Sequence, residues 1–179
     1  MAGSFEREKL KDALHYEIAR AGSRSDFGAT KLYKVLWFSE AKTFLLTGKP
    51  MFNVEFVRQK YGPVPKDGMK IRQELVEDGR VKIWQEDWHN RSQWRFKSIR
   101  HLETDRLTTS DLATINFWTK HIDEDHTAES ISDQSHDYGW EIAKMGEILP
   151  PHAFLAERLR DPTKDELGAA RSKMGYLGL

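Results

Sequence analysis

Two clusters of glycine and proline divide the chain and constrain its fold more than any other feature. They are Gly48-Lys49-Pro50 and Tyr61-Gly62-Pro63-Val64-Pro65. Because proline lacks a backbone donor and fixes φ, no helix can run through either cluster. Glycine often ends a helix, so Gly48 predicts a helix end, whereas the second cluster predicts a rigid corner. Residues 52–61 between them are expected to be extended or irregular.

Apolar residues recur at helical spacing on both sides of these clusters. In the first segment, Leu10, Leu14 and Ile18 lie four residues apart behind a candidate N-cap, Ser4. Such spacing predicts one face of a helix that packs against a core. By the same reasoning the sequence predicts helices over residues 4–21, 26–48, 67–78, 109–122 and from about 127 onward.

Alternating apolar and polar residues indicate strands between the third and fourth predicted helices. Val81 and Ile83, and later Trp94 and Phe96, show this alternation, and residues 87–92 between them predict a broad loop. The predicted fold class is α+β, mainly α. It consists of a bundle of about five to six helices with one antiparallel β-hairpin between the third and fourth helices.

Length and composition narrow the class of protein. The 179 residues correspond to about one domain, which we expect over residues 1–162, followed by a C-terminal tail, 163–179. Lys+Arg 28 and Asp+Glu 28 balance, so the overall charge does not attract nucleic acid or an acidic membrane. The absence of cysteine excludes disulfides and thiolate metal sites. No apolar run approaches the roughly 20 residues that span a bilayer, so we expect a cytoplasmic protein.

Two groups of residues carry the types found in metal or hydrolytic sites. His121, Asp123, Asp125 and His126 lie close together, but they match neither a zinc-protease helix nor a calcium loop. Ser135-His136-Asp137 are consecutive, and consecutive residues cannot form the geometry of a catalytic triad among themselves. We therefore expect no metal, no cofactor and no enzymatic activity.

The hairpin loop offers a mixture of basic and aromatic residues. Trp88, His89 and Arg91 could stack on bases and neutralise phosphates, which leaves nucleic-acid binding as an alternative. Neighbouring acidic residues dilute this charge, and Trp84 and Trp94 are expected to face the core. Trp and Arg are also the commonest hot-spot residues of protein interfaces. We therefore favour a protein interface at Trp88, His89 and Arg91.

Short motifs occur in a fixed order along most of the chain. They are Lys31-Leu32-Tyr33-Lys34-Val35-Leu36-Trp37-Phe38, Gly48-Lys49-Pro50, Tyr61-Gly62-Pro63-Val64, and Ser135-His136 followed by Trp140. This series resembles the Panacea domain of the SocA-like antitoxin family, with the best match over residues 28–150. The family's helix commonly reads Lys-Leu-Leu-Tyr-Phe, whereas the aromatic positions here are Tyr33, Trp37 and Phe38.

The resemblance implies a bacterial, phage or prophage antitoxin that neutralises a co-encoded toxin by binding it directly. One type of family member delivers its toxin to a protease, so a protease unfoldase is a second partner that the resemblance leaves open. The motif residues themselves have a structural explanation, because Gly62 permits unusual backbone angles and Pro63 stiffens the corner. We expect His136 to order a helix junction by a local hydrogen bond, with Trp140 packed beneath it.

Overall fold

The computed structural model describes residues 3–88, 91–150, 164, 165, 167 and 168. Its elements are α1 (Ser4–Ala21), α2 (Ala29–Thr47), β1 (Phe56–Gln59), β2 (Gly62–Pro65), α3 (Gly68–Glu77), β3 (Val81–Trp88), β4 (Arg91–Ser98), α4 (Thr109–Asp125), α5 (Ala128–Gln134), α6 (Tyr138–Ile142) and β5 (Ile148–Leu149). The mainly helical α+β class predicted from the sequence is confirmed. No helix in this described part is long and apolar enough to cross a membrane.

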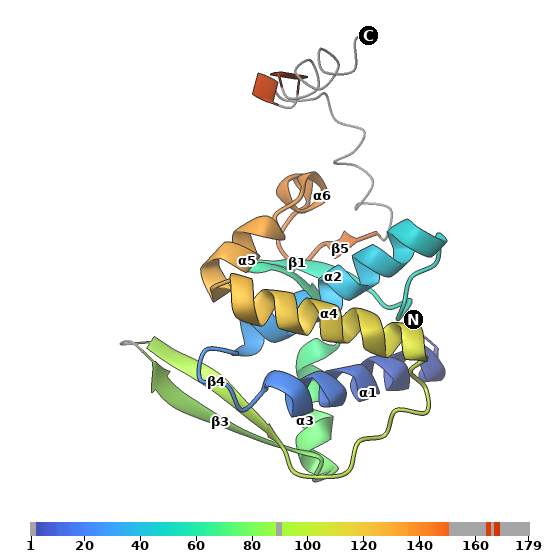
Figure 1. Ribbon diagram of the computed structural model, residues 1–179, viewed down its shortest axis with the longest axis vertical. Coiled ribbons are helices and arrows are strands. Elements are labelled where there is room, and N and C mark those ends of the chain that lie inside the picture. The colour runs from blue at the N-terminus through green and yellow to red at the C-terminus, as the bar shows by residue number, and fades with distance from the viewer. Residues whose placement is uncertain (1–2, 89–90, 151–163, 166, 169–179) are drawn as a thin grey trace.

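Helix α2 lies at the centre of the fold (Figure 1). Every residue from Lys31 to Trp37 is buried, so this part of the helix has no face turned to solvent. A helix buried all round needs neighbours on every side. Helices α1, α4 and α5 and strand β2 supply them, since all four pack against α2. Exposed apolar residues of α2 are confined to its C-terminal end, at Leu45 and Leu46.

The expectation of a single hairpin was wrong, because a second hairpin precedes α3. Strands β1 and β2 pair antiparallel, and β5 adds to the other side of β1 to give the order β2-β1-β5. The segment containing Pro63 and Pro65 was expected to be only a corner, since proline cannot donate to a ladder. It forms a strand because β2 is an edge, where one side of the strand needs no donors.

The predicted hairpin between α3 and α4 is present as β3 and β4, but its strands are longer than expected. Pairing continues through Asp87 with Ser92 to Trp88 with Arg91, so the broad loop expected over residues 87–92 was wrong. Cross-strand pairing also puts Trp84 and Trp94 on opposite faces, because Trp84 pairs with Arg95 and Trp94 with Gln85. The two tryptophans therefore cannot both face the core, contrary to what the sequence predicted. Trp94 is 41% exposed.

Helix ends follow local capping chemistry. Gly48 ends α2 in the left-handed conformation, at φ 71°, and its N–H donates to the Phe44 carbonyl, as the sequence predicted. The cap of α1 is Gly3 and not Ser4, which is the first helical residue. The cap of α4 is Thr108, whose side chain accepts from the Asp111 N–H in a reciprocal capping box.

Charged side chains inside the core tie distant segments together. Asp12 of α1 is fully buried and accepts hydrogen bonds from Arg80 at 3.1 Å and Arg106 at 2.7 Å. Glu40 of α2 accepts the backbone N–H of Phe52 at 2.7 Å, which fastens the loop after the helix, and burial raises the pKa of Glu40 to about 7. Each of these carboxylates has donors that offset the cost of burial.

Glu17 of α1 is different, because its buried carboxyl group has no such donors. Its side chain is 0% exposed, and neither carboxyl oxygen has a hydrogen-bond partner among the described residues. Burial raises the pKa of Glu17 well above its ordinary value. The folded protein therefore holds a proton on Glu17 at pH values where the unfolded chain has lost it.

Replacing Glu17 by Gln should stabilise the fold above about pH 5. Since the pKa is raised in the folded state, the free energy of unfolding of the parent falls as pH rises from the unfolded pKa toward the folded one, by up to about 1.4 kcal/mol per pH unit. Glu17→Gln removes this loss. In urea denaturation at pH 8, the free energy of unfolding of the variant should therefore exceed that of the parent by more than about 1 kcal/mol. The matched control is Glu124→Gln, at a 55% exposed side chain, which should change little. A Glu17→Gln protein no more stable than the parent at pH 8 would contradict the assignment.

Candidate functional site

The sequence motifs that lie far apart in the chain meet at one place in the structure. Lys34 of α2 extends toward the turn between β1 and β2, and its Nζ donates to the Pro63 carbonyl at 3.1 Å. Gly62, the first residue of β2, has φ +93°, and a Cβ there would lie 2.1 Å from Ser135 Oγ and 2.5 Å from Lys34 Nζ. Glycine is therefore required at this position both for its backbone angle and for lack of space.

The junction of α5 and α6 forms the other side of this contact. Ser135 is buried, and its hydroxyl donates to the Ser132 carbonyl at 2.6 Å. The His136 ring stacks on Trp140, with ring centroids 3.6 Å apart, as expected from the sequence. His136 orders the junction through its backbone N–H, which donates to the Asp133 carbonyl at 3.0 Å. Its ring atom Nε2, however, is buried without a hydrogen-bond partner among the described residues.

Trp140 fixes α6 to the β1–β2 hairpin. Its indole Nε1 donates to the Gln59 carbonyl at 3.1 Å, and the Arg58 guanidinium lies 4.1 Å from its ring. The Asp137 side chain caps α6 by accepting the Trp140 N–H at 2.8 Å. Ser135, His136 and Asp137 thus each make a different structural contact at this junction.

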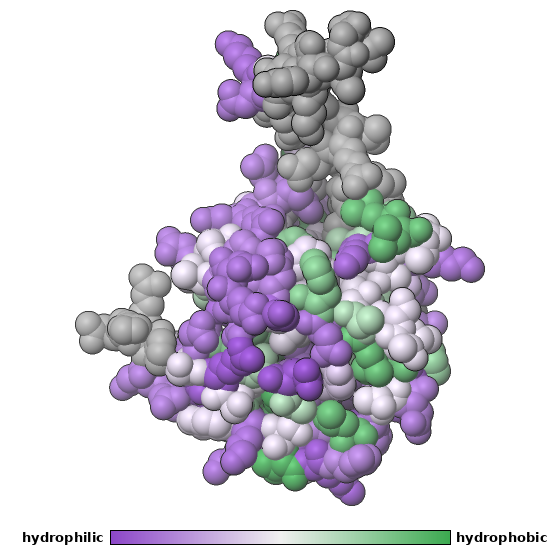
Figure 2. Space-filling model, in the orientation of Figure 1, coloured by the Kyte–Doolittle hydropathy of each residue, from purple (hydrophilic) through white to green (hydrophobic). Residues whose placement is uncertain are grey.

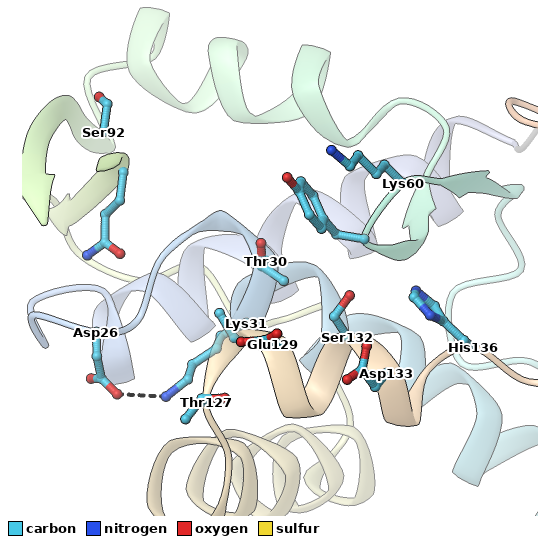
Figure 3. Close-up of a pocket in the computed structure, with 13 residues that line it drawn as sticks. Asp26, Thr30, Lys31, Lys60, Ser92, Thr127, Glu129, Ser132, Asp133 and His136 are labelled. Atoms are coloured by element: carbon cyan, nitrogen blue, oxygen red, sulfur yellow. Dashed lines mark hydrogen bonds and ion pairs between the residues drawn. The ribbon is translucent and has the colours of Figure 1, made fainter. Parts of the chain in front are cut away.

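Two adjoining hollows open beside this junction. The larger, the α2–α5 hollow, has a volume of about 820 Å³ and is lined by Asp26, Thr30, Lys31, Lys60, Tyr61, Ser92, Gln93, Thr127, Ala128, Glu129, Ser132, Asp133 and His136 (Figure 3). The smaller, the Lys34 hollow, has a volume of about 310 Å³ and is lined by Ala29, Thr30, Tyr33, Lys34, Gln59, Lys60, Tyr61, Gly62 and Val64. Thr30, Lys60 and Tyr61 line both, so the hollows share a wall.

The electrostatics of the two hollows differ. Burial lowers the pKa of Lys34 to about 7, and burial together with the positive charge of Lys34 lowers the pKa of His136. Lys31, at the floor of the α2–α5 hollow, forms an ion pair with Asp26 at 2.7 Å, visible in Figure 3. Acidic residues are present only around the larger hollow. Figure 2 shows that the face over α5 and the C-terminal half of α4 is mostly hydrophilic.

The residues weighed as metal ligands have other contacts. His121 pairs with Asp125 at 2.7 Å, His126 contacts Ser130, and Asp123 forms an ion pair with Arg24. Within the described ranges no three His, Asp or Glu side chains are grouped so that they could hold a metal ion.

Of the predicted interface residues, Trp88 and Arg91 belong to the β3–β4 hairpin, whose residues Ser92 and Gln93 line the α2–α5 hollow. Trp88 and Arg91 end the paired strands of the β3–β4 hairpin, but their side chains, like the whole of His89, lie outside the described residues. Of the remaining motif residues, Gly48 and Pro50 lie beyond the opposite end of α2. The hairpin interface therefore stays a prediction.

Sequence reasoning did not single out Lys34, Lys60 or Asp133 as site residues. The hollows form from segments that meet only through the tertiary fold, so no local pattern announces them. Lys34 did leave one signal in the sequence, because it is a charged residue within the otherwise apolar run from Leu32 to Phe38.

The fold is of the α+β class, and the buried helix α2 packs against the proline-containing β1–β2 hairpin. Residues 32–141 match the family model described as "Antitoxin SocA-like, Panacea domain". The chain therefore belongs to the SocA-like Panacea-domain family, and the resemblance noted in the sequence is confirmed. No curated protein and no solved structure shows a significant match to it.

Gly62→Ala should destabilise the fold far more than Gly48→Ala. Both glycines have positive φ, so each substitution costs about 1–2 kcal/mol of backbone strain. Only at Gly62 would the new Cβ also collide with Ser135 Oγ, whereas nothing lies within 4 Å of a Cβ at Gly48. The overpacking should add about 1–3 kcal/mol to the destabilisation by Gly62→Ala. Urea denaturation of both variants measures it as the difference between their free energies of unfolding. Equal losses would show that the junction yields without strain.

Proposed function

We propose that this protein is the antitoxin of a toxin–antitoxin system and neutralises a co-encoded protein toxin by direct binding. The observation that carries the proposal is the match of residues 32–141 to the SocA-like antitoxin family. Binding alone suffices for this function, so no catalytic group is required of the chain. The protein acts in the cytoplasm in this proposal, where its toxin is made.

The burial of the family's motif residues supports this proposal, because it leaves the exposed residues free to form a binding surface. The motif residues Lys31, Leu32, Tyr33, Pro63 and Ser135 are buried. Pro63, Gly62 and Ser135 lie beside Lys34 where α2 meets the β1–β2 hairpin and the α5–α6 junction. Buried residues that hold a fold can stay the same while exposed residues change with the partner. Such a scaffold suits a protein whose task is to present a binding surface.

Co-expression with the neighbouring open reading frame tests the proposal. We expect that the neighbouring product arrests growth by itself, that this protein restores growth, and that the two co-purify. Neither rescue nor co-purification would contradict the proposal. Rescue that depends on a protease unfoldase, with a shortened toxin half-life, would instead identify the protein as an adaptor for proteolysis.

Trp88→Ala should weaken toxin binding at least tenfold and leave the melting temperature within a few degrees of the parent. The reason is the place of Trp88 at the end of the β3–β4 hairpin with Arg91 opposite, two residue types that dominate binding hot spots, where truncation costs about 2 kcal/mol or more. Isothermal titration and thermal denaturation give the two readouts. The control is Trp94→Ala, which removes an exposed tryptophan from the same hairpin. A Trp88→Ala protein that melts much earlier but binds normally would show that Trp88 supports the fold.

A further inference from the structure

Helix α2 carries two buried lysines, and within the described part of the chain only one of them has an acidic partner. Lys31 and Lys34 are each 1% exposed. Lys31 pairs with Asp26 at 2.7 Å. Lys34 forms no ion pair with any described residue, and its single hydrogen bond is to the Pro63 carbonyl at 3.1 Å. A buried cation without a carboxylate costs folding free energy, so its retention needs an explanation.

Lys34 lines the Lys34 hollow, although its side chain is almost fully buried. Its Nζ lies beside Gly62, which lines the same hollow and adds no side chain between Lys34 and the hollow. Ala29, Tyr33 and Val64 contribute apolar walls. The hollow also contains the first residues of α2, whose N-cap, Gly28, makes no side-chain cap, so the backbone donors of the first turn add positive potential.

The order of charges across the two hollows favours one kind of occupant. The Lys34 hollow contains Lys34 and Lys60 and no acidic residue among its lining. The adjoining α2–α5 hollow carries Glu129 and Asp133. A phosphate group with several negative charges would be repelled by these two carboxylates. A protein segment with an acidic side chain beside a basic one matches both hollows, since each charge meets its opposite.

We propose that the Lys34 hollow receives a carboxylate side chain of the protein toxin, with Lys34 as its counter-ion. This proposal rests on the proposed function, since it assigns part of the toxin interface. The carboxylate supplies the acidic partner that Lys34 lacks among the described residues. A basic residue next to it in the toxin would lie over Glu129 and Asp133.

Binding of this kind takes up a proton near neutral pH. Lys34 has a pKa of about 7 in the free protein, and a carboxylate beside it raises that value. Toxin affinity should therefore be constant below pH 7 and fall as pH rises above 7, by up to about tenfold per pH unit. The other titratable or charged residues that line the Lys34 hollow are Tyr33, Lys60 and Tyr61, and His136 lies close enough to feel the charge of Lys34. The pKa of His136 is lowered from 6.5 and that of Tyr33 is raised from 10, so both titrate outside this window.

The first experiment uses acetate as the probe and needs no toxin. Carbon-13 labelled lysine gives NMR signals of the lysine Cε groups, and the signal lost in Lys34→Met assigns Lys34. Acetate at twice its dissociation constant should raise the pKa of Lys34 by about 0.5 unit, while chloride at equal ionic strength should not. No effect of acetate would overturn the proposal. A larger effect of inorganic phosphate would overturn it in favour of a phosphorylated ligand.

The second experiment measures toxin affinity of Lys34→Met at pH 6.5 and 8.5. Met has similar length and carries no charge, so the variant should melt at or above the temperature of the parent. We expect at least tenfold weaker binding at pH 6.5 and loss of the pH dependence. The control is Lys120→Met, which removes an equal charge from a 72% exposed side chain.

The two experiments separate failure of the site from failure of the proposed function. If acetate shifts Lys34 and the parent binds no toxin, the carboxylate site is supported and the antitoxin proposal fails. If the toxin binds parent and Lys34→Met equally, the assignment of the hollow to the toxin is overturned. If Lys34→Met melts much earlier than the parent, the acetate titration of the parent still decides, because it uses the unaltered protein.

Discussion

Burial of α2 on all sides between Lys31 and Trp37 is the constraint on which the rest of the structure depends. A helix without a solvent face can keep polar side chains only if other segments bring partners to them. Asp26 comes to Lys31, the Pro63 carbonyl to Lys34, and the backbone of the loop after the helix to Glu40. The positions of the β1–β2 hairpin and of the loop after α2 therefore follow from the needs of this one helix.

Local patterns in the sequence predicted the helices well. Periodic apolar residues and the helix end predicted at Gly48 located α1, α2 and α3 to within a few residues. Errors came where tertiary context overruled local preference. Pro63 and Pro65 argued against a strand, yet an edge position tolerates them. The length of the β3 and β4 ladder was underestimated, because polar residues around Trp88 resemble a loop while they pair as strands.

The candidate site was predictable only as a set of motifs. The motif containing Gly62 and that containing Ser135 were recognised from the sequence, but their contact with Lys34 depends on the packing of three separate segments. Sequence patterns report the face a residue occupies, not the residue that it meets across the fold. Family membership supports the proposed functional class, whereas the lysines of the Lys34 hollow and the acidic residues of the adjoining hollow come together only in the three-dimensional structure.

The prolines of β2 also limit how another chain can approach the sheet. The Lys66 N–H donates to the Glu55 carbonyl, so by alternation Pro63 and Pro65 turn their backbone atoms away from β1. Neither offers an N–H there, and Lys34 already occupies the Pro63 carbonyl. An incoming strand would thus find no N–H donor at Pro63 or Pro65, which disfavours self-association at this edge by strand addition. A partner that binds here must be recognised through side chains, which can be exchanged one at a time as partners diverge.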